Sequence, residues 1–154
     1  MLLYLVQHAE AKREEEDALR GLTDRGLEDI TGVAAHMGKM NLTVGKIFHS
    51  GKTRALQTAR VLADHLKPNK GVTEIDGLAP MDDPDIWKGR ISQLNEDIAL
   101  VGHLPHLGRL SSLLLSGDKE KNIIDFKMGG IVCLEKFDNG RWSVEWMLIP
   151  EMVK

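Results

Sequence analysis

Two histidines, His8 and His103, each follow an apolar run of the kind that is typical of a buried strand. The runs are Leu2 to Val6 and Asp97 to Val101. Residues just past the C-terminal ends of strands emerge at the edge of an open α/β sheet, where ligands bind. A neutral imidazole has a free nitrogen lone pair at ordinary pH, so it can act as ligand, base or nucleophile. His8 is therefore the first candidate for chemistry, and the plain alternative is a histidine that only ends a strand.

A third polar break follows the segment from Lys46 to His49, where Ser50 precedes Arg54. A helix is expected to begin after this break and after the one at His103. Helix N-termini present unpaired N–H groups and the positive end of the helix dipole, which favour an anion such as phosphate. Two histidines and an arginine at one edge of a sheet would make a phosphate site.

Strand-like and helix-like segments alternate along most of the chain. Strands are expected over residues 2–6, 46–49, 72–75 and 97–101. Helices are expected for some fifteen residues after Thr23-Asp24, after Ser50 as a cap, over 85–94, and from Leu104 or Pro105 onwards. In the first helix Leu27, Ile30, Ala34 and Met37 recur at helical spacing, which indicates that they face a core.

The C-terminal part has a different pattern. Residues 130–137 and 141–149 are strand-like and are joined by Asp138-Asn139-Gly140, and Asn-Gly between such segments is the strongest short-range hairpin signal. In the second segment Trp142, Val144, Trp146 and Leu148 alternate with their neighbours, as in a strand near a sheet edge. The whole order predicts an α/β fold, a three-layer α/β/α sandwich whose mostly parallel sheet has an antiparallel edge.

Composition limits the classes of function. A chain of 154 residues with 42% hydrophobic content predicts one domain over residues 1–154. A net charge of −3 without a basic block predicts no nucleic-acid partner and no membrane partner. The opening apolar run is too short for a signal peptide or a spanning helix. Because the single Cys133 cannot form an internal disulfide, a reducing, cytoplasmic location is expected.

Several blocks of sequence resemble one known family. Leu5-Val6-Gln7-His8-Ala9-Glu10 is similar to the Arg-His-Gly signature of the histidine phosphatase superfamily, whose fold is shared with cofactor-dependent phosphoglycerate mutase. Residues 22–26, 50–59 and 101–105 resemble the later blocks of the family in the right order. The closing residues 146–150 resemble the short bacterial branch whose named activity is phosphohistidine phosphatase. The resemblance covers nearly the whole chain, and the ordered set is more specific than any one block.

This resemblance implies that His8 is a nucleophile that attacks phosphorus and forms a covalent phosphohistidine, which water then hydrolyses. Arg54 would hold the phosphoryl oxygens and His103 would donate to them as charge builds up, without a metal ion or a cofactor. The implied substrate is a phosphorylated protein, above all a phosphohistidine-containing signalling domain, or a small phosphoester. The residues expected to bind it are Gln7, Ser50, Arg54 and Glu10.

The first block departs from the family pattern at two positions. The family has arginine where this chain has Gln7, and glycine where it has Ala9. Glutamine can still donate from its amide, but it carries no charge and cannot fork across two phosphate oxygens as arginine does. The loss of one charge-assisted hydrogen bond typically costs about 1.5–3 kcal/mol, or roughly 10–100-fold in binding or rate. Activity is thus expected to be weakened and not abolished, and Ala9 is expected to have a negative φ.

The residue that protonates the leaving group stays open among Glu10, Asp82, Asp83 and His106. Phosphohistidine needs little help from such an acid, because its P–N bond is labile and the leaving imidazole can take up its own proton. The segment from Leu78 to Trp87 is too short for a substantial lid. An open site of this kind suits a phosphorylated side chain on another protein.

Two rival functions remain. The first is a phosphate-recognising or interaction domain with weak or no catalysis, which the uncharged Gln7 favours. The second is a metal-dependent hydrolase that uses His8, His103, His106 and Glu10, although their spacing does not resemble a metal-binding helix.

Overall fold

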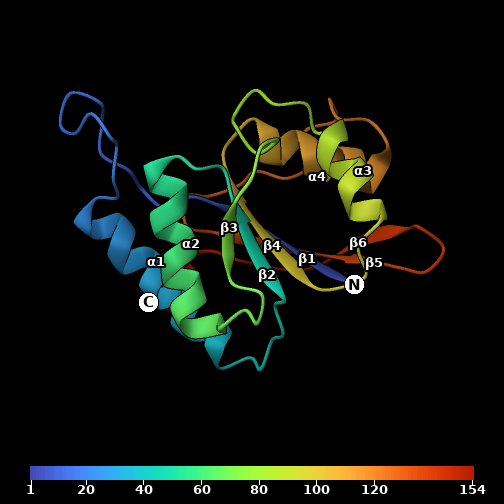
Figure 1. Cartoon of the computed structure of the whole chain (residues 1–154), viewed down its shortest axis with the longest axis horizontal. Helices are drawn as coiled ribbons and strands as arrows, with labels where there is room; N and C mark the ends of the chain where they lie inside the picture. The colour runs from blue at the N-terminus through green and yellow to red at the C-terminus, as the bar shows by residue number, and fades with distance from the viewer.

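A six-stranded sheet separates two layers of helices in the computed structural model, which describes residues 1–154 (Figure 1). The predicted alternation of strands and helices is confirmed, with most boundaries within two residues of those expected. The elements are β1 (Leu2–Gln7), α1 (Asp24–Gly38), β2 (Lys46–His49), α2 (Thr53–Leu66), β3 (Val72–Glu74), α3 (Asp85–Ser92), β4 (Ile98–Gly102), α4 (His106–Ser116), β5 (Ile131–Lys136), β6 (Trp142–Leu148) and the 3₁₀ helix η1 (Pro150–Val153).

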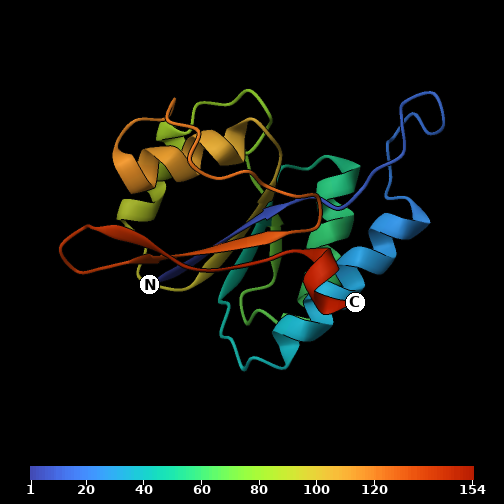
Figure 2. The same ribbon diagram turned by 180° about the vertical axis from the view of Figure 1, so that it is seen from behind.

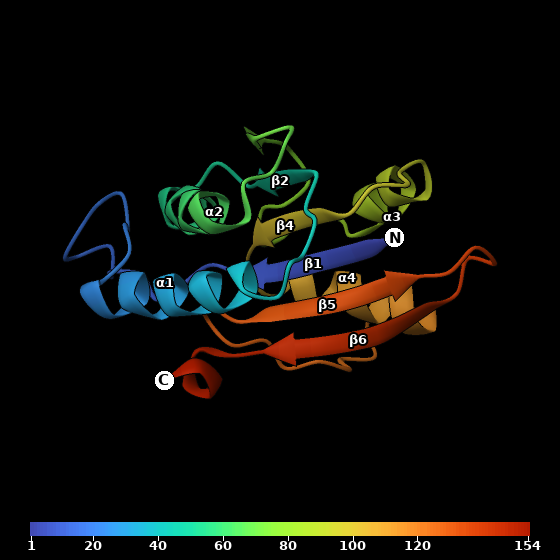
Figure 3. The same cartoon turned by 90° about the horizontal axis from the view of Figure 1, so that it is seen from below.

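The strand order is β3-β2-β4-β1-β5-β6, and Figure 3 shows β2, β4, β1, β5 and β6 side by side in that order. The first four strands are parallel, whereas β5 is antiparallel to both β1 and β6. Helices α1 and α2 lie against one face, with η1 beside α1 (Figure 2), and α3 and α4 lie against the other. The predicted three-layer α/β sandwich with an antiparallel edge is therefore confirmed.

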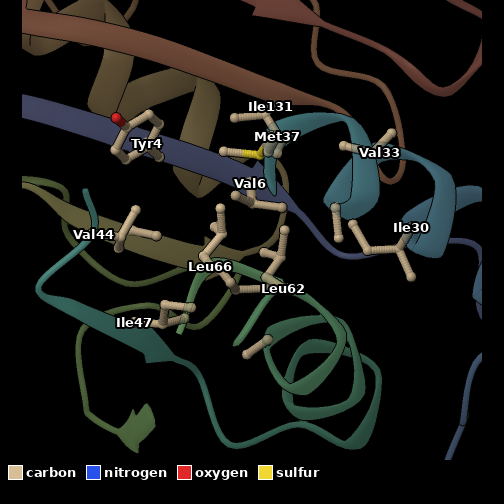
Figure 4. Packing of buried hydrophobic residues seen from close by; sticks show 14 of the residues in the cluster. Tyr4, Val6, Ile30, Val33, Met37, Val44, Ile47, Leu62, Leu66 and Ile131 are labelled. Carbon is tan, nitrogen blue, oxygen red and sulfur yellow. The ribbon is translucent and has the colours of Figure 1, made fainter. Parts of the chain in front are cut away.

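Strand β1 is buried on both faces because helices cover both sides of the sheet. Tyr4 and Val6 face a core shared with α1 and α2, where Figure 4 shows Val6 near Leu62 and Leu66 of α2. Leu3 and Leu5 face a second core shared with α3 and α4. This two-sided burial explains why the segment is a continuous apolar run and not an alternating one. None of the helices is both long and apolar enough to pass through a bilayer.

Helix α1 begins where the sequence predicted, but one of its four expected core residues is exposed. The Thr23 side chain accepts a hydrogen bond from the backbone N–H of Gly26, and Ile30, Ala34 and Met37 are buried. Leu27, however, is 49% exposed, so the prediction that it faces the core was wrong. Figure 3 shows that α1 extends past the tip of β1, with its first turn farthest from the sheet.

The alternation predicted for the last strand is interrupted by a β-bulge. Cys133 pairs with Trp146 while Leu134 pairs with Val144, so the register of β6 shifts between them. A bulge adds one unpaired residue, which turns the side chains that follow to the opposite face. Trp142 therefore packs against the core of α3 and α4, whereas Trp146 packs against the core of α1 and α2.

Gly26 lies where α1 packs most closely on the chain that leaves β1. A Cβ atom at this position would overlap the backbone carbonyl oxygen of Glu10, and no neighbouring flexible side chain could move away to relieve the overlap. Thr23 also donates from its backbone N–H to the same carbonyl, over 3.0 Å. The glycine therefore lets the start of α1 pack on the segment that carries His8.

We expect Gly26→Ala to lower the free energy of unfolding by about 1–3 kcal/mol, because the added methyl group has no room. Gly32→Ala is the matched control, since it lies in the same helix and its added Cβ would only touch a methyl group of Val153 at 3.5 Å. That control is expected to raise the free energy of unfolding by about 0.5–1 kcal/mol, because alanine loses less backbone entropy in a helix. Urea denaturation checks both, and a shift of both variants in the same direction would contradict the packing argument.

Candidate active site

The three polar breaks seen in the sequence meet at one edge of the sheet. Strand β4 lies between β1 and β2 and runs parallel to both, so the residues that follow these strands are neighbours. The rings of His8 and His103 lie 5.1 Å apart between centroids. The Ser50 hydroxyl shares a hydrogen bond of 2.6 Å with Nε2 of His103. The structure thus brings together side chains separated by up to 95 positions along the chain.

Ser50 does not cap α2 as the sequence had suggested. The helix begins at Thr53 with Lys52 at the N-cap position, and no side chain caps it. The chain turns at Gly51, which has a φ of +90°, and the Ser50 hydroxyl meets His103 and also accepts from the backbone N–H of Lys52 over 3.4 Å. Ser50 therefore lies in the candidate site, where it can position the histidine.

His8 is held in a defined protonation state. Its Nδ1 lies 2.7 Å from the carbonyl oxygen of Ala9, and a carbonyl only accepts, so Nδ1 carries the proton. Nε2 is then the nitrogen with the free lone pair. Burial, and to a lesser extent the charges of Arg54 and Arg20, lower the pKa of His8 to about 4. The ring is therefore neutral and nucleophilic at neutral pH.

Arg54 reaches this edge from the first turn of α2. Its Nε is buried and has no hydrogen-bond partner within the protein. Burial lowers the pKa of its guanidinium, and the charge of Arg20 lowers it further. A buried, unpartnered guanidinium nitrogen is costly unless an acceptor reaches it. An oxyanion beside His8 would be such an acceptor.

Thr58, one turn after Arg54, connects the helix to the end of β1. Its hydroxyl donates to the Arg54 carbonyl over 2.8 Å and accepts from the backbone N–H of Ala9 over 3.0 Å. Sequence reasoning missed this residue, although its spacing of four from Arg54 places both on one side of the helix. Ala9 is fully buried and is not among the residues with positive φ, which confirms the expectation for its backbone.

His103 is buried at the start of the turn that leads into α4. Its Nδ1 has no hydrogen-bond partner, and Nε2 meets Ser50. Burial lowers the pKa of His103 to about 3, and the nearby His8 and Arg54 contribute. Like His8, the ring is uncharged at neutral pH, and its position among these groups suits it to face the same small anion.

Gln7 is buried at the end of β1, and its side-chain oxygen has no hydrogen-bond partner. Its backbone carbonyl accepts from the N–H of Gly129 over 3.0 Å, which joins the segment before β5 to the site. Glu10 is directed elsewhere, because one of its carboxylate oxygens accepts from the hydroxyl of Thr23 over 2.8 Å. Substrate binding by Gln7 and Glu10 stays a prediction.

None of the four residues considered as the acid is hydrogen-bonded to His8 or His103. Glu10 is bound to Thr23, and Asp82 accepts from the backbone N–H of Ala79. Asp83 lies 3.5 Å from the ammonium group of Lys119, and hydrogen bonding from the backbone of Asp85 lowers its pKa. Nowhere do three His, Cys, Asp or Glu side chains gather as they would to hold a metal ion, so the donor set of the metal-dependent alternative is not assembled.

His106 is completely buried, and neither of its ring nitrogens has a hydrogen-bond partner. Burial lowers its pKa to about 4, although the charge of Asp82 opposes this shift. The residue lies at the start of α4, three positions after His103. Two unpartnered polar atoms in a buried position cost stability and point to a strained local environment.

A surface groove of about 490 Å³ begins beside the site. Leu104 and Pro105, which follow His103, line one end, and Lys127, two residues before Gly129, lines another part. Arg109 and Glu120 also line it and form an ion pair of 3.0 Å. The groove thus includes the two residues that follow His103, but none of the candidate site residues His8, Ser50, Arg54 and His103 lines it.

This architecture is shared with solved structures of phosphatases. The protein histidine phosphatase SixA, complexed with tungstate, is 21% identical over 100% of both chains with a TM-score of 0.88. The alpha-ribazole phosphatase from Shigella flexneri is 16% identical over 97% of each chain with a TM-score of 0.79. A phosphoserine phosphatase mutant from Entamoeba histolytica, in complex with phosphoserine, is 18% identical over 99% of both chains with a TM-score of 0.72.

The chain has the histidine phosphatase fold. At these identities the similarity is one of fold, and it confirms the architecture that the blocks of sequence predicted. The sequence matches no protein-family model, and no curated protein matches it either. Within the histidine phosphatase fold, the candidate site lies at the C-terminal edge of β1, β4 and β2, as expected for an open α/β sheet.

Thr58→Val is expected to lower the free energy of unfolding by about 1–3 kcal/mol, because the buried N–H of Ala9 loses its acceptor. Thr58→Ser is the matched control, since it keeps the hydroxyl and removes only a methyl group. Urea denaturation measures the stability, and the NMR signals of the His8 ring report any displacement of the segment. An equal loss of stability in the two variants would show that the hydrogen bond of the hydroxyl does not contribute to the free energy of unfolding.

His106→Leu is expected to raise the free energy of unfolding at pH 7 by about 1–3 kcal/mol, because the two unpartnered nitrogens disappear. It should also weaken the dependence of stability on pH. Between pH 6.5 and about 4 the unfolded chain protonates His106 while the folded chain does not, so the wild type loses stability as the pH falls. The leucine variant lacks this contribution, which amounts to about 1.4 kcal/mol per pH unit.

Urea denaturation at pH 7 and pH 5 measures both effects. His36→Leu, at an exposed position near the end of α1, is the control and should change stability little. A loss of stability in His106→Leu at both pH values would mean that the ring has partners the structure does not reveal.

Proposed function

We propose that this protein is a phosphatase that removes phosphoryl groups, above all from phosphohistidine on another protein, through a covalent intermediate on His8. The observation that supports this proposal is the protonation and the surroundings of the His8 ring. Its Nδ1 is hydrogen-bonded to a carbonyl, its Nε2 is free, and its ring is neutral near His103 and near Arg54, whose Nε is buried without a partner. Such an imidazole is poised to attack an electrophilic phosphorus.

In the first step, Nε2 of His8 forms a bond to phosphorus while the bond to the leaving group breaks. Negative charge spreads over the three equatorial oxygens of the phosphoryl group, so catalysis consists mainly of positioning and charge stabilisation. Arg54 donates to these oxygens through its guanidinium, and His103, set by Ser50, lies against the same group. The proton stays on Nδ1 of His8, which donates to the Ala9 carbonyl oxygen, and this hydrogen bond stabilises the ring as it gains positive charge.

In the second step, water attacks phosphorus, the bond to Nε2 breaks, and inorganic phosphate leaves. Neither step needs a metal ion or a cofactor. Two steps with a good nucleophile replace one difficult displacement by water. The SixA structure, with its bound tungstate, shows that a related fold accommodates a tetrahedral oxyanion, and we propose the same kind of ligand here.

Phosphohistidine is the substrate that best fits the groups around His8. No carboxylic acid is hydrogen-bonded to either histidine, and an alkyl phosphate needs a proton donor for its leaving oxygen. The imidazole that leaves from phosphohistidine takes up its own proton. The groove of about 490 Å³, lined in part by Leu104 and Pro105 after His103, offers a surface for the polypeptide that carries the phosphoryl group. A small phosphoester is the alternative substrate, which would not need this surface.

Gln7 supports a second candidate function. Its side chain is buried and carries no charge, and although its amide N–H groups can donate to a phosphate oxygen, they lack the charge of a guanidinium. The protein would then be a phosphate-recognising domain that binds phosphorylated partners and releases them unchanged. A cytoplasmic location, inferred from the single cysteine, suits both functions.

The test is a paired assay of the wild type and Gln7→Arg on a phosphohistidine protein and on an aryl phosphate. We expect both to release phosphate faster from phosphohistidine, and Gln7→Arg to gain about 10–100-fold because it restores one charge-assisted contact. His8→Ala is the control and should release none. Label from the substrate should be trapped on His8 in the wild type only.

Comparable turnover of phosphohistidine and an unactivated alkyl phosphate would contradict the assigned substrate. Binding of inorganic phosphate without release of phosphate from any substrate, and without label on His8, would instead establish the recognition domain. An arginine variant that gains nothing would mean that charge at position 7 is not limiting.

A further inference from the structure

The loop between β1 and α1 carries an arginine whose charge has no partner. Arg20 forms one hydrogen bond, from Nε to the carbonyl oxygen of Lys12 over 3.1 Å, and it makes no ion pair. This is unusual, because the loop is rich in acidic residues and most of its side chains are exposed while Arg20 is half-buried. Figure 1 shows the loop projecting beyond α1 and α2, and Arg20 lies near its base.

The acidic neighbours of Arg20 are engaged elsewhere. Glu16 pairs with Arg13 over 2.8 Å. Asp17 uses both carboxylate oxygens on the backbone, accepting from the N–H groups of Leu19 and Gly21 over 3.0 and 2.9 Å. These bonds build a tight turn that holds Arg20 at a φ of +50°, a left-handed conformation that is rare and costly for a side chain of this size.

The base of the loop is fixed to the helix that carries Arg54. Leu22 donates from its backbone N–H to Oε1 of Gln57 over 2.7 Å, and Gln57 lies one turn after Arg54. Leu22 also pairs with Ala11 across the base, and Lys12 donates to Gly21 over 2.9 Å. The position of Arg20 relative to Arg54 is therefore set by hydrogen bonds on both sides.

The hydrogen bond of Leu22 to Gln57, one turn after Arg54, keeps the base of the loop, and Arg20 with it, beside the helix that carries Arg54. In keeping with this position, the charge of Arg20 lowers the pKa of both His8 and Arg54. Neither Arg20 nor Arg54 forms an ion pair with a carboxylate, so the repulsion between their charges is not offset by a paired acid. A phosphoryl group between them would turn this repulsion into two attractive, charge-assisted contacts.

We propose that Arg20 is an anion-binding residue of this site and supplies the second guanidinium that the uncharged Gln7 does not. The proposal rests on the proposed function, because it assigns a phosphoryl group to the anion. In this arrangement Arg54 approaches the phosphoryl oxygens from α2, and Arg20 approaches them from the loop before α1. The charge lost at position 7 is thus made up by a residue thirteen positions later in the chain.

The test compares Arg20→Asn with Arg13→Asn. Asparagine tolerates the left-handed conformation, so the turn should be preserved. Arg13 lies in the same loop, is 78% exposed and pairs with Glu16, so its loss removes the same charge farther from the site. Isothermal titration with inorganic phosphate should show binding weakened about 10–100-fold in Arg20→Asn and little changed in Arg13→Asn.

NMR titration of the His8 ring gives a readout that a merely structural role would not produce. Its pKa should rise in Arg20→Asn, because a nearby positive charge is gone, and stay unchanged in Arg13→Asn. Adding Gln7→Arg to Arg20→Asn should recover much of the lost phosphate affinity. This recovery would show that the two positions serve the same anion.

Unchanged phosphate affinity in Arg20→Asn, or an equal loss in Arg13→Asn, would overturn the assignment. These measurements do not depend on turnover, so they separate the two proposals. If the wild type binds phosphate through Arg20 but hydrolyses nothing, the phosphatase fails and the assignment stands. If hydrolysis proceeds equally in both variants and the wild type, the assignment fails and the phosphatase stands.

Discussion

One short hydrogen bond, from Nδ1 of His8 to the carbonyl oxygen of Ala9, determines which nitrogen of the ring can react. Three contacts hold the backbone on either side of that carbonyl. Thr58 holds the N–H of Ala9, Gly129 donates to the backbone of Gln7 and His8, and Gly26 lets α1 pack on the next residue. The reactive nitrogen is thus positioned by backbone contacts from α1, α2 and the segment before β5.

Electrostatics then give the site its preference for an anion. His8 and His103 are both kept neutral, mainly by burial, while Arg54 and Arg20 bring positive charge that no carboxylate neutralises. Neutral imidazoles can donate or attack, whereas protonated ones could no longer attack. Burial and the cations therefore act in the same direction, since both disfavour a further positive charge on the histidines.

The substitution at position 7 changes this balance without removing it. Relative to the arginine that the family resemblance predicts, a glutamine lowers the charge at this position by one, and its buried acceptor oxygen has no partner. The backbone of Gln7 continues the pairing of β1 with β4 and accepts from Gly129, so the fold accommodates glutamine here. Under our proposals the exchange affects anion binding, for which the cations come from α2 and from the loop before α1.

The sequence by itself determined the order of strands and helices, because two-residue and 3.6-residue periodicities and Asn139-Gly140 are local signals. It also indicated that His8, Ser50 and His103 follow the C-terminal ends of strands, whereas the order that makes those strands neighbours is seen only in the sheet. It did not determine the exposure of Leu27, the bulge that turns Trp142 and Trp146 to opposite faces, or the partner of the Ser50 hydroxyl. The hydrogen bonds by which Thr58 joins α2 to Ala9, and the position of Arg20 beside α2, also follow from the tertiary structure. These features depend on contacts between segments far apart in the chain, and such contacts exist only once the helices have packed on the sheet.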